Sequence, residues 1–199
     1  MQPTQTLPED FKEDFAFDLS KNIPAQVVLN FAALALVFTF GRGFVQLFGV
    51  LRPEFVFGGI GSLLQGFNLI AIIPTLFLMM LAHEAVHGIG FWGFTRSRPA
   101  FGLKLGYAYA AAPDWYVPRN QFVIVGLAPL VVLSVLGCVL APWLLLAAMP
   151  ALLVFLAMNA GGSVGDMFVV WKVAAYPPSA LVNDRGESFT IYVEMPKTP

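Results

Sequence analysis

The sequence is poor in charged residues. Only 12% of its 199 residues are Asp, Glu, Lys or Arg, whereas about a quarter are charged in an average soluble domain. The net charge of −1 gives no electrostatic reason to expect nucleic acid as a partner. The single cysteine, Cys138, excludes an internal disulfide, and its apolar neighbours indicate an inert buried thiol. These absences, with 58% hydrophobic residues, point to a lipid bilayer as the partner and solvent of the chain.

Long hydrophobic runs are what the sequence has instead. A helix needs about 20 apolar residues to cross a bilayer, and four segments approach that length. The predicted fold class is therefore all-α and integral to the membrane, with about four transmembrane helices and short cytoplasmic hairpins or loops. The predicted spans are approximately residues 23–40, 67–91, 121–141 and 143–171. Residues 41–66 fit a loop, an interfacial helix or an extension of the first helix.

The spans divide the chain into a tail at residues 1–22 and one membrane-embedded domain at 23–199, which ends in a polar segment at 172–199. The tail, the loop between spans two and three, and the last segment carry nine Lys and Arg residues, whereas the opposite side carries only Arg42 and Arg52. Basic loops tend to stay in the cytoplasm. Both termini are therefore expected on the cytoplasmic side.

The N-terminal tail, the middle loop and the C-terminal segment each have a local pattern of apolar residues that predicts secondary structure. The tail has apolar residues at helical spacing, which favours a helix on the membrane surface or, equally, a loosely ordered tail. Residues 103–109 alternate weakly and predict a hairpin or an edge strand, which could hold an extended substrate by strand addition. Residues 180–182 and 189–193 flank a turn-forming segment and predict a second small hairpin.

The second span contains the five-residue sequence His83-Glu84-Ala85-Val86-His87. Residues four apart on a helix lie on one face, so both imidazoles can bind one Zn²⁺ ion, and the adjacent Glu84 is the general base that activates a zinc-bound water. The alternative is a pair of core histidines. It is disfavoured because the chain has only two histidines and ionisable groups inside a membrane span are costly and usually functional.

A catalytic zinc site normally has a third protein ligand. Among the acidic residues, only Glu84 and Asp166 lie inside predicted spans, so Asp166 is the candidate third ligand. A helix–helix hydrogen bond is its alternative role. Near it, Gly161 and Gly165 allow close helix packing that would bring Asp166 to the histidines, although the glycines fit a local helix break as well.

The spans also contain an amide side chain near Asp166 and two prolines. Asn159 lies seven residues before Asp166, where its amide could bind a substrate carbonyl or a developing oxyanion, or form an interhelical hydrogen bond. Pro74 and Pro129 interrupt two spans and predict helix kinks. No chemistry is assigned to either proline.

The order of His83-Glu84-x-x-His87, one further span and then Asp166 resembles the core of the site-2 protease class. More closely, residues 81–192 resemble small bacterial membrane proteins grouped as putative zincin peptidases, through Ala128-Pro129 and the 159–166 segment among others. The resemblance implies peptide-bond hydrolysis in or near a bacterial cytoplasmic membrane. It implies zinc held by His83, His87 and Asp166. The sequence departs from the site-2 pattern because Met167, and not glycine, follows Asp166.

Three functions follow from these residues. The first is a zinc endopeptidase that acts on a membrane protein or peptide substrate. The second is a membrane metal-binding protein or transporter without protease activity, and the third is a scaffold that no longer binds zinc. The predicted gathering of polar groups at one depth favours the enzyme, because a transport path needs polar groups at several depths.

Overall fold

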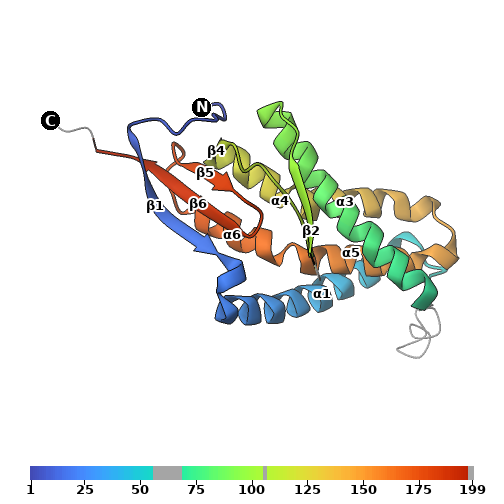
Figure 1. Ribbon diagram of the computed structural model, residues 1–199. Coiled ribbons are helices and arrows are strands. Elements are labelled where there is room, and N and C mark those ends of the chain that lie inside the picture. The colour runs from blue at the N-terminus through green and yellow to red at the C-terminus, as the bar shows by residue number, and fades with distance from the viewer. Residues whose placement is uncertain (56–68, 105–106, 197–199) are drawn as a thin grey trace. The chain divides into compact units, whose positions relative to one another are not determined.

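The computed structural model describes residues 1–55, 69–104 and 107–196, and these are mostly helical with two small antiparallel sheets (Figure 1). The helices are α1 (Ile23–Leu51), α3 (Leu69–Thr95), α4 (Arg119–Leu140), α5 (Met149–Gly162) and α6 (Val164–Ala174), with short 3-10 turns η1 (Leu19–Lys21), η2 (Ala141–Trp143) and η3 (Leu146–Ala148). The strands are β1 (Phe11–Asp18), β2 (Ala100–Lys104), β3 (Tyr107–Ala111), β4 (Tyr116–Pro118), β5 (Leu181–Asp184) and β6 (Ser188–Glu194). The predicted all-α class is therefore correct for the helices but omits the sheets.

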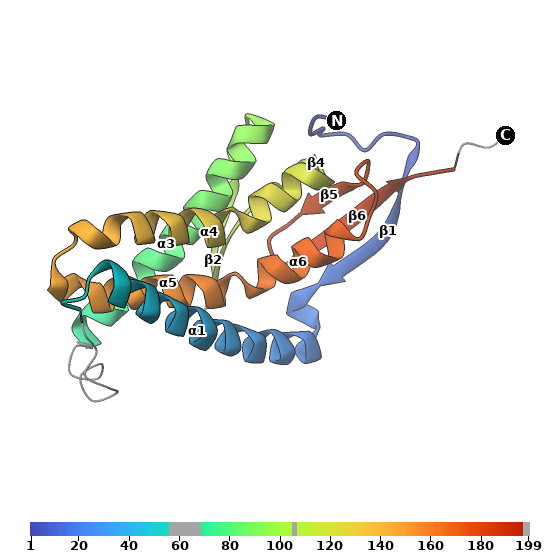
Figure 2. The same ribbon diagram turned by 180° about the vertical axis from the view of Figure 1, so that it is seen from behind.

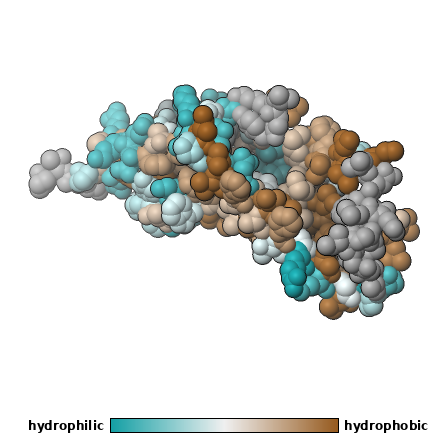
Figure 3. Space-filling view, turned by 90° about the horizontal axis from the view of Figure 1, so that it is seen from below, coloured by the Kyte–Doolittle hydropathy of each residue, from teal (hydrophilic) through white to brown (hydrophobic). Residues whose placement is uncertain are grey.

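The described residues contain four helical segments long and apolar enough to cross a membrane. They are Ile23–Leu51, Ile70–Thr95, Arg119–Trp143 and Leu146–Ala174. Many of their large apolar side chains point outward, among them Phe31 and Phe38 of α1. Hydrophobic surface is extensive on the face seen in Figure 3. An apolar exterior of this kind is compatible with a lipid environment.

Helix α1 continues well past its predicted end at residue 40. Its extension to Leu51 is one of the three alternatives left open for residues 41–66, of which residues 56–66 lie outside the described part of the chain. Just after α1, the Arg52 guanidinium donates hydrogen bonds to the carbonyls of Ala141, Pro142 and Leu144 at 2.8–3.1 Å. These carbonyls belong to the turn that follows α4, so the arginine joins this turn to the end of α1.

The fourth predicted span consists of two helices, α5 and α6, with a break at Ser163. The backbone N–H and the hydroxyl of Ser163 both donate to the carbonyl of Asn159. Helix α5 ends at Gly162 and α6 begins at Val164, which agrees with the local break that the glycines fit. Close packing at Gly161 differs from the prediction, because a Cβ there would lie 2.5 Å from Val37 of α1. Gly161 therefore packs against the first helix, and close packing at this glycine does not bring Asp166 to the histidines.

The chain forms two compact units, and the first comprises residues 1–29, 84–128 and 165–199. It contains a four-stranded antiparallel sheet in the order β1-β6-β5-β4 and the two-stranded sheet β2-β3. Both predicted hairpins are confirmed, β2-β3 by the short sheet and β5-β6 by the larger one. Helix α6 packs on the larger sheet, where the rings of Phe17 and Phe168 lie 5.2 Å apart (Figure 2).

Strand β1 overturns both predicted conformations of the N-terminal tail. Residues Phe11–Asp18 pair with β6, with a bulge between Glu13 and Phe15. Phe15 and Phe17 stack with each other and pack on the buried core of the unit. The helical spacing of apolar residues in the tail does not decide its conformation, because pairing with β6 outweighs it.

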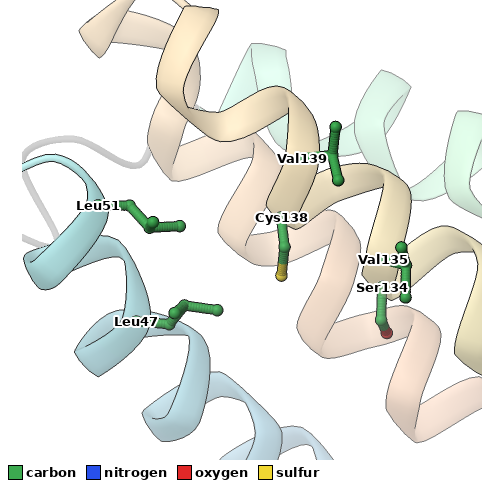
Figure 4. Close-up of a pocket in the computed structure, with 6 residues that line it drawn as sticks. All are labelled: Leu47, Leu51, Ser134, Val135, Cys138 and Val139. Carbon is green, nitrogen blue, oxygen red and sulfur yellow. The ribbon is translucent and has the colours of Figure 1, made fainter.

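The second unit comprises residues 30–83 and 129–164. Its core contains Phe44 and Phe48 of α1 with Met149, Leu153 and Leu156 of the fourth span. An open apolar groove of about 420 Å³ runs between α1 and α4 (Figure 4). Leu47, Leu51, Ser134, Val135, Cys138 and Val139 line the groove. The predicted buried thiol of Cys138 is thus only partly buried.

Candidate functional site

Helix α3 carries the histidine pair and Glu84. It runs without interruption from Leu69 to Thr95, so His83 and His87 are one turn apart and project to the same side. Both side chains are buried, with 6% and 7% of their surfaces exposed. Because both residues belong to one helix, the helix itself fixes the distance between the two rings.

Helix α6 brings Asp166 to this pair. Asp166 lies in the first turn of α6, after the break at Ser163, and its Oδ1 is 3.3 Å from Nε2 of His87. Two ligands about 2.1 Å from one tetrahedral zinc ion would be about 3.4 Å apart. The observed separation therefore fits a shared metal ion, although a direct ion pair of His87 with Asp166 has a similar length.

The Nδ1 atom of each ring faces an oxygen that can only accept a hydrogen bond. His87 Nδ1 is 3.1 Å from the backbone carbonyl of Val125. His83 Nδ1 is 3.0 Å from Oδ1 of Asn159. Each Nδ1 must therefore carry a proton and donate it, which leaves Nε2 as the atom through which a neutral ring binds a metal. Outer partners of this type are the usual way in which proteins orient zinc-binding histidines.

The three predicted ligands lie together. One ligand atom each from His83, His87 and Asp166 lies within 4.8 Å of the others. Two imidazoles and one carboxylate match the three protein ligands of catalytic zinc sites, which leave one position for water. The residues present thus fit a zinc ion in their donor types, spacing and ring orientation.

A family model described as "Putative zincin peptidase" matches residues 76–181, which is just over half of the chain. The chain belongs to this family. The match includes the histidine pair, Glu84 and Asp166. No curated protein and no solved structure matches the chain. Membership in the zincin peptidase family supports a metallopeptidase and implies zinc as the metal.

The side chain of Asn159 is held by protein groups at both of its polar atoms. It is fully buried, its Oδ1 accepts from His83, and its Nδ2 donates to the carbonyl of Pro129 at 3.2 Å. Both polar atoms of its side chain therefore have protein partners. This geometry supports an interhelical hydrogen bond as the role of Asn159, while binding of a substrate oxygen stays a prediction.

Sequence reasoning missed Asp184, which it placed only in a turn. Burial raises the pKa of Asp184 to about 6; the Gly186 N–H and the His87 ring oppose this rise, whereas the negative charges of Asp166 and Glu84 add to it. Asp184 ends β5 and its Oδ1 accepts from Gly186 N at 2.7 Å. The charges of the site therefore affect the pKa of Asp184, although this residue follows the last predicted span. Only the fold brings Asp184 close enough to the site for this interaction.

Replacing Asp184 by Asn should change the pH dependence of stability in zinc-free protein. The folded state binds the proton more tightly than the unfolded state, whose pKa is near 3.8. Wild-type stability should therefore fall as the pH rises from about 4 to 6 and stay low above that, by about 1–3 kcal/mol. Thermal unfolding across this range should show a flatter profile for Asp184→Asn. Asp114→Asn, on an exposed turn, is the control and should keep the wild-type fall.

Proposed function

We propose that the protein is a zinc-dependent endopeptidase that hydrolyses peptide bonds in or near a membrane. The observation that carries this proposal is that two histidines, each hydrogen-bonded through Nδ1, lie with Asp166 so that their ligand atoms are within 4.8 Å of one another. His83, His87 and Asp166 would hold the ion. When bound, zinc supplies Lewis acidity, which lowers the pKa of water and polarises a carbonyl group.

Glu84 is the proposed general base. It follows His83 directly on α3, and its charge acts on Asp184 together with that of Asp166. A carboxylate in this position can take a proton from the attacking water and pass it to the amine that leaves. Proton transfer by a positioned side chain of this kind contributes about 10²–10⁴-fold to rates.

The proposed setting is a membrane crossed by four helices, with both termini on the cytoplasmic side. The larger sheet supports this topology. It combines β1 from the N-terminal segment, β4 from the loop between spans two and three, and β5 and β6 from the C-terminal segment. Strands of one sheet must lie on the same side of a bilayer, because open sheet edges do not pass through lipid. The basic residues of these three segments then make that side cytoplasmic.

The β2-β3 sheet is the proposed place for an extended substrate. The ring of Phe101 on β2 packs against Gly88, which follows His87 on α3. Within the described residues, neither β2 nor β3 pairs with a further strand. An open strand edge beside a histidine of the site can hold a peptide by main-chain hydrogen bonds.

Substituting Gly88 by Leu tests this contact. A Cβ at Gly88 would lie 2.5 Å from Phe101, so a leucine must displace β2. We expect KM for a peptide substrate to rise about 10-fold, equivalent to about 1.4 kcal/mol of lost binding, with zinc content unchanged. Gly93→Leu on the same helix is the matched control, because a Cβ there meets nothing within 4 Å. Equal KM values for the two variants would contradict the role of β2.

Cleavage of a co-expressed membrane protein, compared between wild type and Glu84→Gln, tests the enzyme function itself. A metal transporter is the competing function. Zinc flux into liposomes that contain the purified protein, without any cleavage of added or co-expressed substrates, would favour transport and contradict the peptidase.

A further inference from the structure

The one proline inside α4, Pro129, lies next to the partners of both histidines. It is fully buried, and the backbone around it supplies two hydrogen-bond acceptors to the site. We infer that Pro129 is a positioning residue that fixes the orientation and tautomer of His83 and His87 before a metal binds. The part that concerns metal affinity rests on the proposed zinc site, whereas the part that concerns the tautomers does not.

The first acceptor exists because proline lacks an N–H group. In a regular helix the N–H of residue 129 donates to the carbonyl of Val125. Pro129 cannot make this bond, so the Val125 carbonyl is left without its normal helical donor. Val125 is almost fully buried, and a buried carbonyl without a donor is costly. His87 Nδ1 supplies the donor at 3.1 Å.

The second acceptor is the carbonyl of Pro129 itself. It accepts a hydrogen bond from Nδ2 of Asn159 at 3.2 Å. This bond decides which way the Asn159 amide points, since only its nitrogen can donate to a carbonyl. The amide oxygen is thereby turned toward Nδ1 of His83 at 3.0 Å. The proline carbonyl thus acts on His83 through one intervening side chain.

The two acceptors match the two histidines in spacing. The carbonyls of Val125 and Pro129 are one turn apart on α4, and His83 and His87 are one turn apart on α3. Both rings are therefore held with the proton on Nδ1 and the metal-binding lone pair on Nε2. A proline that served only to bend the helix would have no effect on the tautomer of His87.

The test uses metal-free protein labelled with ¹⁵N in its two histidines, in detergent at a pH where both rings are neutral. In the wild type, both imidazoles should carry their proton on Nδ1. In Pro129→Ala, the new N–H of residue 129 can bond to the Val125 carbonyl and compete with His87. The His87 signal should therefore shift toward the Nε2-protonated form, and titration with zinc alone should show about 10–100-fold weaker binding.

The melting temperature of Pro129→Ala should not fall with its zinc affinity. Removing a proline from a helix interior restores a backbone hydrogen bond, so Pro129→Ala should melt at or above the wild-type temperature. Pro74→Ala in α3 is the matched control and should keep both tautomers and the zinc Kd. Asn159→Ala provides an independent test, because it should alter the tautomer of His83 and leave His87 protonated on Nδ1.

Wild-type tautomers in Pro129→Ala, whatever its melting temperature, would overturn the inference. So would an Asn159→Ala variant with an unaltered His83. If the tautomers shift as expected but wild-type protein binds no zinc, the positioning role of Pro129 stands and the proposed zinc function fails. The two proposals are therefore separated by the metal-free spectra.

Discussion

Replacing Glu84 by Gln should reduce peptide cleavage about 10²–10⁴-fold while zinc stays bound. Glutamine preserves the size of the side chain but cannot accept a proton from water, so only proton transfer is lost. The three proposed metal ligands are unchanged in this variant. Cleavage of a co-expressed membrane substrate gives the rate, and metal analysis of the same purified protein gives the zinc content.

Glu194→Gln is the matched control for this experiment. Glu194 is an exposed residue at the end of β6, where it pairs with Phe11, so the same chemical change there should leave cleavage at the wild-type rate. If Glu84→Gln cleaves as fast as the control, Glu84 is not the general base. A variant that loses zinc together with activity would instead place Glu84 among the metal ligands.

Purified wild-type protein should contain about one zinc ion per chain, and His83→Ala and Asp166→Ala should contain almost none. A catalytic zinc ion is normally held by three protein ligands, so removing one of them leaves too few. The two variants remove ligands from different helices, α3 and α6. Metal analysis of all three proteins tests the site and its third ligand together.

The control for the Asp166 variant is Asp114→Ala, because Asp114 is exposed in the turn before β4. It should retain wild-type zinc. Full zinc occupancy in Asp166→Ala would show that Asp166 serves only as the partner of His87. Absence of zinc from the wild type as well would favour a scaffold without a metal.

Much of the helical architecture is readable from the sequence. The predicted spans at 67–91 and 121–141 correspond to α3 and α4 with ends that differ by a few residues. Hydrophobic length alone identifies them, because a helix in lipid satisfies all its backbone groups internally. The hairpins β2-β3 and β5-β6 were also predicted, since turn residues and alternation are local signals.

Pairing between distant segments is what the sequence leaves open. Part of the tail forms β1 because β6, at least 170 residues later, offers an edge to it. Nothing within residues 1–22 encodes this partner. The extension of α1 to Leu51 is likewise held by contacts of Arg52 with carbonyls about 90 residues away. Such long-range contacts override local propensity.

The sequence by itself identified the proposed metal-binding pair. The four-residue spacing of His83 and His87 places both on one helix face wherever that helix lies, because helix geometry is local. The sequence also singled out Asp166, by the cost of an acid in a membrane span. Only the tertiary structure decided that Asp166 lies beside His87. It also decided that Asn159 and the Val125 carbonyl accept hydrogen bonds from the two Nδ1 atoms. The electrostatic influence of Glu84, His87 and Asp166 on Asp184 likewise depends on the fold. The two histidine hydrogen bonds and the contact of His87 with Asp166 join residues about 40 to 80 positions apart. They depend on how α4, α5 and α6 pack, which no local pattern specifies.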